Sequence, residues 1–405
     1  MEKRIESLAA HYSESIFALS DAIWQFSEVR FETPHSADAM TALLYDEGFN
    51  ITRPLATLDH AFMAHFGSEG PIIGFLAEYD ALGEANHGCG HNLLGSGSCL
   101  AALICKAMME ELELKYQVRV YGCPAEESGY GKGIMNEQGV FDDLAICLTW
   151  HPNTFTQVWT DKTLAVQQVQ FDFQGTASHA AGAPEQGRSA LDAAELMNIG
   201  VNYLREHVSD DVRIHYAYLN AGGPSANVVP DKASLYYFIR AKSLQDVDAV
   251  VERVKKIAYG AAQMTETNVL IKSDGRCKSY NANHILSKQL HQAILDLGPI
   301  LSTNKHYDQT IKNPVFNQTG FVSTDVGDVS WTVPTAQIFI ACEPIGFPMH
   351  AREWHDQGRS SYAHQGIVKA GSVLALAGLR TLLNPDEMAA VQSEFKAQLA
   401  LSDRL

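Results

Sequence analysis

The sequence predicts an α/β protein in which a smaller α+β domain interrupts a larger α/β domain. Hydrophobic residues make up 46% and charged residues 19% of the 405 residues, so the chain can bury a full core. Short apolar strands alternate with helices up to about residue 164, and this alternation returns after about residue 280. Between them the patterns follow the order β-α-β-β-α-β of a ferredoxin-like domain. We therefore expect one domain over 1–164 and 277–405, with an insert over 165–276.

The elements of the larger domain follow from apolar spacing and turn residues. From Ile5 to Phe26, apolar residues recur every three or four positions, which predicts an amphipathic helix. A second helix is predicted over 36–47, with Ser36 as its N-cap and Gly48 as its stop. The remaining predicted strands are 61–66, 72–77, 116–123, 144–149 and 336–342, and the remaining helices are 95–112, 132–138, 285–297 and 362–383.

The insert shows its own alternation of strands and helices. The stretch 165–173 alternates apolar and polar residues, as a strand with one solvated face does. A Gly- and Pro-rich connection over 220–231 joins two further strands. The remaining strands of the insert are predicted over 212–219, 232–241 and 268–273, and its helices over 188–207 and 243–265.

Composition excludes several classes of function. The net charge is −17, from 47 acidic and 30 basic residues, and such a chain repels the phosphates of nucleic acids. Seven irregularly spaced cysteines do not make a secreted disulfide framework. The N-terminus lacks the pattern of a signal peptide, and no run approaches the roughly 18 apolar residues that span a membrane. We expect a cytoplasmic protein without nucleic-acid or membrane partners.

Side chains of metal-ligating type follow the predicted strands. The strands over 72–77, 116–123 and 144–149 are each followed within the next loop by carboxylate, thiolate or imidazole groups. In an open α/β sheet the carboxyl ends of the strands form the usual site edge, so we expect these groups to meet there. The residues concerned are Asp80, Cys89, His91, Glu126, Glu127 and His151.

This set of donors is typical of a transition-metal site. Thiolate and imidazole favour Zn²⁺, while carboxylates also allow Mn²⁺. Cys89 and His91 are separated by one residue, and a bridging Cys89 thiolate would hold two ions a few ångströms apart. The chain has 16 histidines, and His350 is our choice for a further ligand, with His355 and His364 as the competing positions.

Glu126 and Glu127 can take two different roles, one in metal binding and one in proton transfer. Adjacent side chains on an extended segment point to opposite sides, so one carboxylate can bind metal while the other faces the bound water. A metal lowers the pKa of its water toward about 7, and a nearby carboxylate can then take the proton. We assign Glu126 as general base and Glu127 as ligand, and the reverse order stays open on sequence grounds.

Several of these residues lie in longer motifs. With them the chain resembles the M20 metallopeptidases, and more narrowly their branch of N-acyl-amino-acid and aminobenzoyl-glutamate hydrolases, with the B-subunit type nearest. The resemblance extends from about residue 31 to residue 364. The departures are Gly83, where the family usually has proline, and Gly88, where it usually has alanine. The motifs are YDAL at 79–82, HGCGHN at 87–92, PAEE at 124–127, WHP at 150–152, GTASHA at 175–180, GRSALDA at 187–193 and DVGDVSW at 325–331.

The resemblance implies an M20 peptidase-like catalytic domain with two divalent metal ions and an inserted ferredoxin-like lid and dimerisation domain. It implies Glu126 as the base and Asp80 as an orienting residue. The implied metal ligands are Cys89, His91, Glu127, His151 and His350.

The resemblance also assigns roles within the insert. His179 is implied to reach a neighbouring subunit's site and hold the substrate carbonyl or oxyanion. Asn227 is the implied substrate-binding asparagine. Arg276 is the implied partner of the substrate carboxylate, with Arg240 as the other candidate.

The expected activity is metal-dependent hydrolysis of an amide bond. The expected substrate is an N-acyl or aroyl amino acid such as aminobenzoyl-glutamate, or a small dipeptide, and the expected assembly is a homodimer through the insert. The alternative is a non-catalytic or partner-dependent chain that works alongside a homologous partner of the A type. Asp325 and Asp328 we interpret as structural or pocket-shaping.

Overall fold

The structure is a computed structural model that describes residues 1–316, 318–320 and 322–402. The chain divides into two compact units. The first unit comprises Met1–Lys162, Tyr280–Gly320 and Asp325–Leu405, and the second comprises Thr163–Ser279 and Phe321–Thr324. The first unit is therefore built from segments that precede and follow the second unit in the sequence.

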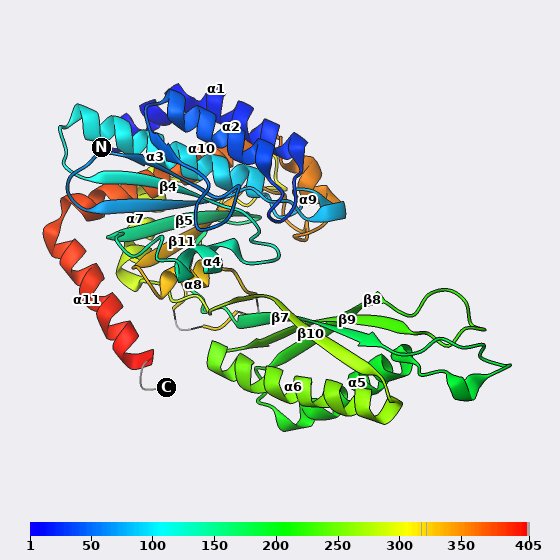
Figure 1. Cartoon of the computed structure of the whole chain (residues 1–405). Helices are drawn as coiled ribbons and strands as arrows, with labels where there is room; N and C mark the ends of the chain where they lie inside the picture. The colour runs from blue at the N-terminus through cyan, green and yellow to red at the C-terminus, as the bar shows by residue number, and fades with distance from the viewer. Residues whose placement is uncertain (317, 321, 403–405) are drawn as a thin grey trace. The chain divides into compact units, whose positions relative to one another are not determined.

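A mixed sheet forms the centre of the first unit (Figure 1). β3 pairs in parallel with β4 and β5, and β11 pairs in parallel with β5. Every residue of β3 is buried, as expected for a strand covered on both faces. In spatial order the strands are β1 (Asn50–Thr52), β2 (Phe62–Phe66), β4 (Gln117–Cys123), β3 (Ile72–Glu78), β5 (Ile146–Asn153), β11 (Thr335–Ala341) and β6 (Gln157–Trp159).

Helices cover both faces of this sheet (Figure 1). The apolar sides of α1 (Glu2–Phe26), α2 (Pro34–Asp46), α3 (His91–Glu111), α7 (His284–Leu297) and α10 (Ser361–Leu383) share one hydrophobic core with the strands. The opposite face packs against α4 (Gly131–Glu137) and α8 (Val326–Ser330) in a smaller core. The remaining helices of the first unit are α9 (Arg352–Gln357) and α11 (Pro385–Ser402).

α3 and α10 are long and apolar enough to cross a membrane by length and composition alone. In α3 89% and in α10 72% of the most apolar window is buried inside the structure. Both helices contribute to the same core as the sheet, so they have the burial of core helices in a globular domain.

The second unit has the predicted order of strands and helices. Its antiparallel sheet has the strand order β10-β7-β9-β8, and the buried residues of its two helices pack with that sheet. The α/β class with a ferredoxin-like insert is thus confirmed. The elements are β7 (Ala165–Gln174), α5 (Ala190–Leu204), β8 (Arg213–Asn220), β9 (Lys232–Ala241), α6 (Leu244–Thr265) and β10 (Asn268–Cys277).

Some local predictions were wrong. Thr33, not Ser36, is the N-cap of α2, since Pro34 takes the first helical turn, where its missing N–H costs nothing. The Ser36 hydroxyl instead donates to Glu28, 2.7 Å away. His151 does not follow a strand, because pairing with β11 extends β5 to Asn153. The predicted loop around Asp325 contains the short helix α8, and β1, β6, α9 and α11 were not predicted.

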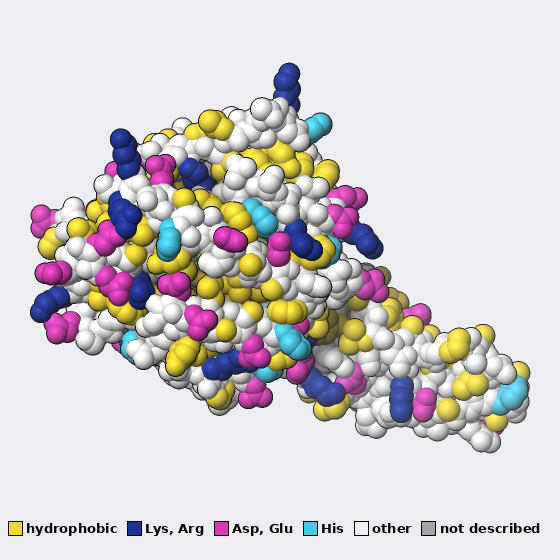
Figure 2. All heavy atoms as spheres, turned by 90° about the horizontal axis from the view of Figure 1, so that it is seen from above, with side chains coloured by type: hydrophobic (Ala, Val, Ile, Leu, Met, Phe, Trp, Pro, Cys, Tyr) yellow, Lys and Arg dark blue, Asp and Glu magenta, His cyan; other side chains and the backbone are white. Residues whose placement is uncertain are grey.

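The surface of the larger unit carries charges of both signs. On the face shown in Figure 2, acidic and basic side chains are interspersed with apolar ones. A net charge of −17 over the whole chain favours solubility and does not attract polyanions.

Candidate metal centre

The candidate ligands lie at one edge of the central sheet. β3 runs parallel to β4 and β5, so the carboxyl ends of these strands meet at that edge. Glu78 is the last residue of β3 and pairs with Cys123, the last residue of β4. Asp80 and Glu126 follow these two strands in the chain, and His151 lies two residues before the end of β5.

A glycine turn brings Cys89 and His91 to this edge. Gly90 has a φ of +80°, a conformation that favours glycine, and it caps α3, whose first residue is His91. A Cβ atom on Gly90 would lie 2.6 Å from Pro152 Cγ, so a larger residue would also clash. The result is a distance of 3.3 Å between Cys89 Sγ and His151 Nε2.

The two imidazoles are oriented by their Nδ1 atoms. His91 is fully buried, and its Nδ1 lies 2.9 Å from the Asp80 carbonyl oxygen. His151 Nδ1 lies 2.7 Å from the Pro152 carbonyl oxygen. A carbonyl only accepts, so each Nδ1 carries the hydrogen and each Nε2 is the ring nitrogen directed at the other candidate ligands. This is the orientation that metal-binding histidines take.

The two glutamates lie in a constrained loop between β4 and α4. Ala125 has a φ of +63°, and its carbonyl accepts a hydrogen bond from the Tyr130 N–H at 2.9 Å. The Glu127 N–H donates to Asp80 Oδ2 at 3.1 Å. Left-handed backbone in a non-glycine residue is uncommon and concentrates at functional sites. Here it directly precedes Glu126.

Both carboxylates face the histidines. Glu126 Oε2 and Glu127 Oε1 each lie 3.9 Å from His91 Nε2. His350 Nε2 lies 3.6 Å from Glu127 Oε2, and the backbone N–H of His350 donates to the Gly88 carbonyl at 2.8 Å. The His350 side chain is 54% exposed, so this side of the centre is open to solvent.

Cys89 belongs to two groups of potential metal ligands. In each group one ligand atom per residue lies within 4.8 Å of the others. The first group is Cys89, His91 and His151, and the second is Cys89, Glu127 and His350. The Cys89 sulfur is therefore common to both groups of potential ligands.

The donor atoms fit divalent cations. His91 Nε2 and Glu127 Oε1 are buried and have no hydrogen-bond partner among the residues that the structure describes. Burial, reinforced by the charges of Glu78 and Glu127, raises the pKa of Glu126 well above its ordinary value. Burial lowers the pKa of His151 to about 4, so its imidazole is neutral at pH 7. Crowded carboxylates beside the neutral imidazole of His151 gain from bound positive charge.

A buried lysine next to this centre was missed by the sequence analysis. Lys132 of α4 is fully buried, and its Nζ lies 2.7 Å from Glu78 Oε1 and 2.5 Å from Asp325 Oδ1. Lysine is rarely buried, and no local pattern distinguishes this one from a surface lysine. A third ligand-like group unites Glu78 with His91 and Glu126.

The other nearby histidines are engaged elsewhere. His87 Nε2 donates to a backbone carbonyl of α1 at 3.0 Å, and burial lowers its pKa to about 3. His355 stacks on Trp24 with a centroid separation of 4.3 Å. His364 Nε2 lies 3.0 Å from Asp21 Oδ1. Of the three late histidines, His350 is the one whose ring faces Glu127.

In the second unit, His179 and Asn227 lie on adjacent segments. His179 and Val228 form an isolated antiparallel β-bridge, and the Ala180 N–H donates to the Asn227 carbonyl at 2.9 Å. The Nδ1 atom of His179 accepts hydrogen bonds from two backbone N–H groups, at 3.0 and 3.2 Å. Its Nε2 therefore carries the hydrogen on an exposed side chain.

The two candidate arginines of the second unit have different partners. Arg276 Nη1 lies 3.3 Å from Asp248 Oδ1, and both side chains are largely exposed. Arg240 donates to the Ser323 hydroxyl at 2.6 Å. Neither contact links an arginine to His179 or Asn227.

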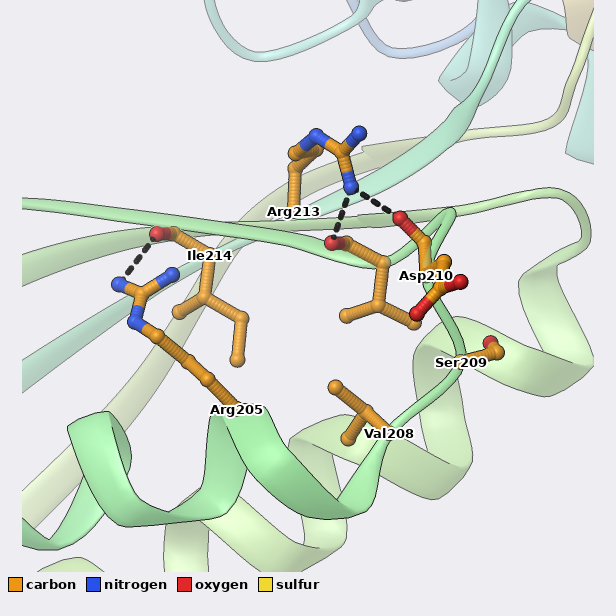
Figure 3. Close-up of a pocket in the computed structure, with 7 residues that line it drawn as sticks. Arg205, Val208, Ser209, Asp210, Arg213 and Ile214 are labelled. Carbon is orange, nitrogen blue, oxygen red and sulfur yellow. Dashed lines mark hydrogen bonds between the residues drawn. The ribbon is translucent and has the colours of Figure 1, made fainter.

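A separate small cavity of about 250 Å³ opens on the second unit (Figure 3). The guanidinium groups of Arg205 and Arg213 donate to backbone carbonyls there, so they close local turns. None of the candidate site residues lines it. The lining residues are Arg205, Val208, Ser209, Asp210, Val212, Arg213 and Ile214.

Comparison with known proteins places the chain in a family. Residues 166–264 match the family model described as Peptidase dimerisation domain. The chain is 38% identical to the B chain of the p-aminobenzoyl-glutamate hydrolase of Escherichia coli, over 93% of this chain and 91% of that protein. The chain belongs to the M20 peptidase family. Its predicted membership is confirmed, and like its named relatives it is a hydrolase.

Two further M20 relatives extend the comparison. Xaa-Arg dipeptidase of Mus musculus is 29% identical over 98% of this chain and 93% of its own length. A solved structure from Bacillus subtilis, described as a dinuclear metal-binding peptidase from the M20 family, superposes with a TM-score of 0.60 at 17% identity. It covers 91% of this chain and 99% of its own, and shows a shared fold.

Proposed function

We propose that the protein is a metal-dependent hydrolase of the amide bond in an N-acyl or aroyl amino acid, such as aminobenzoyl-glutamate, or in a small dipeptide. The observation that carries this proposal is the position of Cys89 in two ligand groups, with the paired carboxylates Glu126 and Glu127 beside them. The similarity to the p-aminobenzoyl-glutamate hydrolase of Escherichia coli supports the substrate class.

The proposed ligands form two sets that would hold two ions, zinc or manganese, and Cys89 belongs to both sets. His91 and His151 would hold one ion, and Glu127 and His350 would hold the other. The solvent-facing position of His350 beside Glu127 supports it over His355, whose ring stacks on Trp24. Asp80 orients one residue of each proposed ligand set. Its backbone carbonyl accepts from His91 Nδ1, and its carboxylate accepts from the Glu127 backbone N–H.

Glu126 is the proposed general base. When bound, the ions would acidify a water molecule and polarise the scissile carbonyl. Glu126 takes the proton of the attacking water and delivers it to the leaving nitrogen, which balances the hydrolysis. Its raised pKa, caused by burial and by neighbouring carboxylates, suits a group that must hold a proton between the two transfers.

The insert supplies the proposed substrate contacts. His179 can donate its Nε2–H to a developing oxyanion, because its Nδ1 is occupied as an acceptor. Asn227 lies on the neighbouring segment and binds the substrate. Arg276 pairs with the substrate carboxylate, exchanging its exposed contact with Asp248. We keep 1–164 and 277–405 as the catalytic domain and 165–276 as the lid.

A homodimer through the insert and a cytoplasmic location complete the proposal. β8 stands at the edge of the second sheet, and an unpaired edge strand is a template for another chain. Large apolar side chains on β8 and α5 are exposed, which favours a partner surface. They are Ile199, Tyr203, Tyr216, Tyr218 and Leu219.

The alternative is a chain that needs a homologous partner for activity. The relatives include the A chain of the same p-aminobenzoyl-glutamate hydrolase of Escherichia coli, 28% identical over 54% of this chain and 54% of that protein. Because both chains of that hydrolase are similar to this protein, a mixed assembly is a specific competitor.

One experiment separates the two. The purified chain is assayed for metal content and for hydrolysis of aminobenzoyl-glutamate and a panel of dipeptides. Two equivalents of metal and activity without a second protein support the proposal. Metal-loaded but inactive protein that gains activity only with a homologous partner supports the alternative.

A further inference from the structure

Glu78 lies between the candidate metal centre and a buried lysine. Its side chain is 2% exposed, so its charge must be balanced within the protein. Its Oε1 lies 2.7 Å from Lys132 Nζ, and its Oε2 lies 3.3 Å from His91 Nε2. The two oxygens of one carboxylate thus face two different groups.

Lys132 is held in place from a second direction. Asp325 contacts its Nζ through Oδ1 at 2.5 Å and accepts the Lys132 backbone N–H through Oδ2 at 2.9 Å. This double contact fixes the ammonium group relative to the first turn of α4. Glu78 and Asp325 therefore share one buried ammonium group, and the second oxygen of Glu78 faces His91 instead.

The second oxygen of Glu78 faces a candidate metal ligand. His91 Nε2 is buried and has no hydrogen-bond partner among the described residues. Glu78 Oε2 lies 3.3 Å from this nitrogen, and the two residues form one group of potential metal ligands with Glu126. A cation at this position can bind both the carboxylate oxygen and the ring nitrogen.

We propose that Glu78 is an additional ligand of the metal ion on the His91 side of the centre. Lys132, fixed by Asp325, is the positioning residue that turns Glu78 Oε2 toward this ion. The inference rests on the proposed function, since it requires the ion that His91 and His151 hold. Glu78 adds a carboxylate oxygen to a set of thiolate and imidazole ligands. This addition makes the position more favourable for Mn²⁺ than the other ligands alone would.

The test uses the full-length protein freed of metal and titrated with Co²⁺. Glu78→Gln keeps the shape of the side chain and removes its charge. We expect one of two Co²⁺ equivalents to bind about 10- to 100-fold more weakly, with a changed visible spectrum. The other equivalent should keep its affinity.

Glu343→Gln is the matched control. Glu343 is also a fully buried carboxyl of the first unit, and neither of its oxygens has a hydrogen-bond partner among the described residues. It is not in any of the ligand-like groups found within the described residues. This variant should bind both equivalents as the unsubstituted protein does.

The positioning role is tested with the double variant Lys132→Met/Asp325→Asn. It removes one positive and one negative charge together, so the net charge of the buried group is unchanged. We expect the same equivalent to weaken and the same spectral change, in protein shown to be folded by its melting transition. A purely structural pair would lower the melting temperature without changing the Co²⁺ spectrum.

If Glu78→Gln does not fold, Glu78→Asp retracts the carboxylate and must show the same selective weakening. Wild-type affinity and spectrum for both equivalents in the folded Glu78 variant would overturn the inference. That result leaves the proposed function intact when the unsubstituted protein binds two ions and hydrolyses substrate. Unsubstituted protein that binds no metal would instead refute the proposed function itself.

Discussion

Cys89 Sγ lies 3.3 Å from His151 Nε2, although 62 positions separate the two residues in the chain. The contact depends on Gly90, which turns the chain at the start of α3, and on β5, which carries His151 along the sheet. It joins the loop after β3 to the end of β5.

Substitution of Cys89 tests the bridge. Cys89→Ala should lower the affinity for both ions, because the thiolate belongs to both ligand groups, and should reduce kcat/KM by about two orders of magnitude or more. Metal content and activity are measured together. Cys99→Ala, which removes a buried cysteine within α3, is the control and should keep both ions. Loss of only one ion in Cys89→Ala would contradict a bridging role.

The two glutamates should separate in their effects. Glu126→Gln should retain both metals while kcat falls by about 10²- to 10⁴-fold, because the proton acceptor is gone. Glu127→Gln should instead weaken the ion on the His350 side. Metal titration and steady-state kinetics distinguish them, and the opposite pattern would reverse the two assignments.

His350 and His355 should differ in the quantity that each substitution changes. His350→Ala should weaken one metal equivalent with little effect on stability, because the side chain is 54% exposed. His355→Ala should keep the metals but cost about 1 kcal/mol or more in the free energy of unfolding, since it loses its stacking on Trp24. Metal loss in His355→Ala at unchanged stability would move the ligand assignment to His355.

Glu343 makes stability depend on pH. Burial raises its pKa from 4.5 to about 9, so the folded protein keeps a proton that the unfolded chain releases above about pH 4.5. This difference in pKa between the folded and unfolded protein lowers the free energy of unfolding as pH rises from about 4.5 to 9. The loss is about 1.4 kcal/mol per pH unit. Glu343→Gln should gain stability relative to the unsubstituted protein at pH 8 compared with pH 5. Urea unfolding of the metal-free proteins at both pH values measures this, and an equal difference at both would contradict it.

The exposed apolar surface of the second unit should control assembly. Tyr203 is 74% exposed on α5, and Tyr203→Lys places a charge in the proposed contact. We expect sedimentation equilibrium to show a shift from dimer toward monomer. Tyr45→Lys changes a similarly exposed tyrosine of the first unit and should leave the dimer unchanged. A Tyr203→Lys protein that remains dimeric would place the interface elsewhere.

The sequence by itself determined the architecture. Strand alternation and helix periodicity are local properties, so they predicted the β-α-β-β-α-β insert and its position within the larger domain. They also predicted that ligand-like side chains gather at one edge, because parallel strands end together. Local patterns were less reliable at the ends of elements. The Ser36 hydroxyl donates to Glu28 and does not cap α2, and pairing with β11 extends β5 beyond its predicted end.

Only the tertiary structure decided which partners meet across long stretches of chain. Lys132 and Asp325 are 193 positions apart, and nothing in the local pattern around Lys132 predicts its burial. The position of His350 beside Glu127, with His355 against Trp24, likewise depends on packing between distant segments. Helix and strand periodicity reports which face of an element is apolar, whereas the pairing of buried charges is set by how those elements pack together.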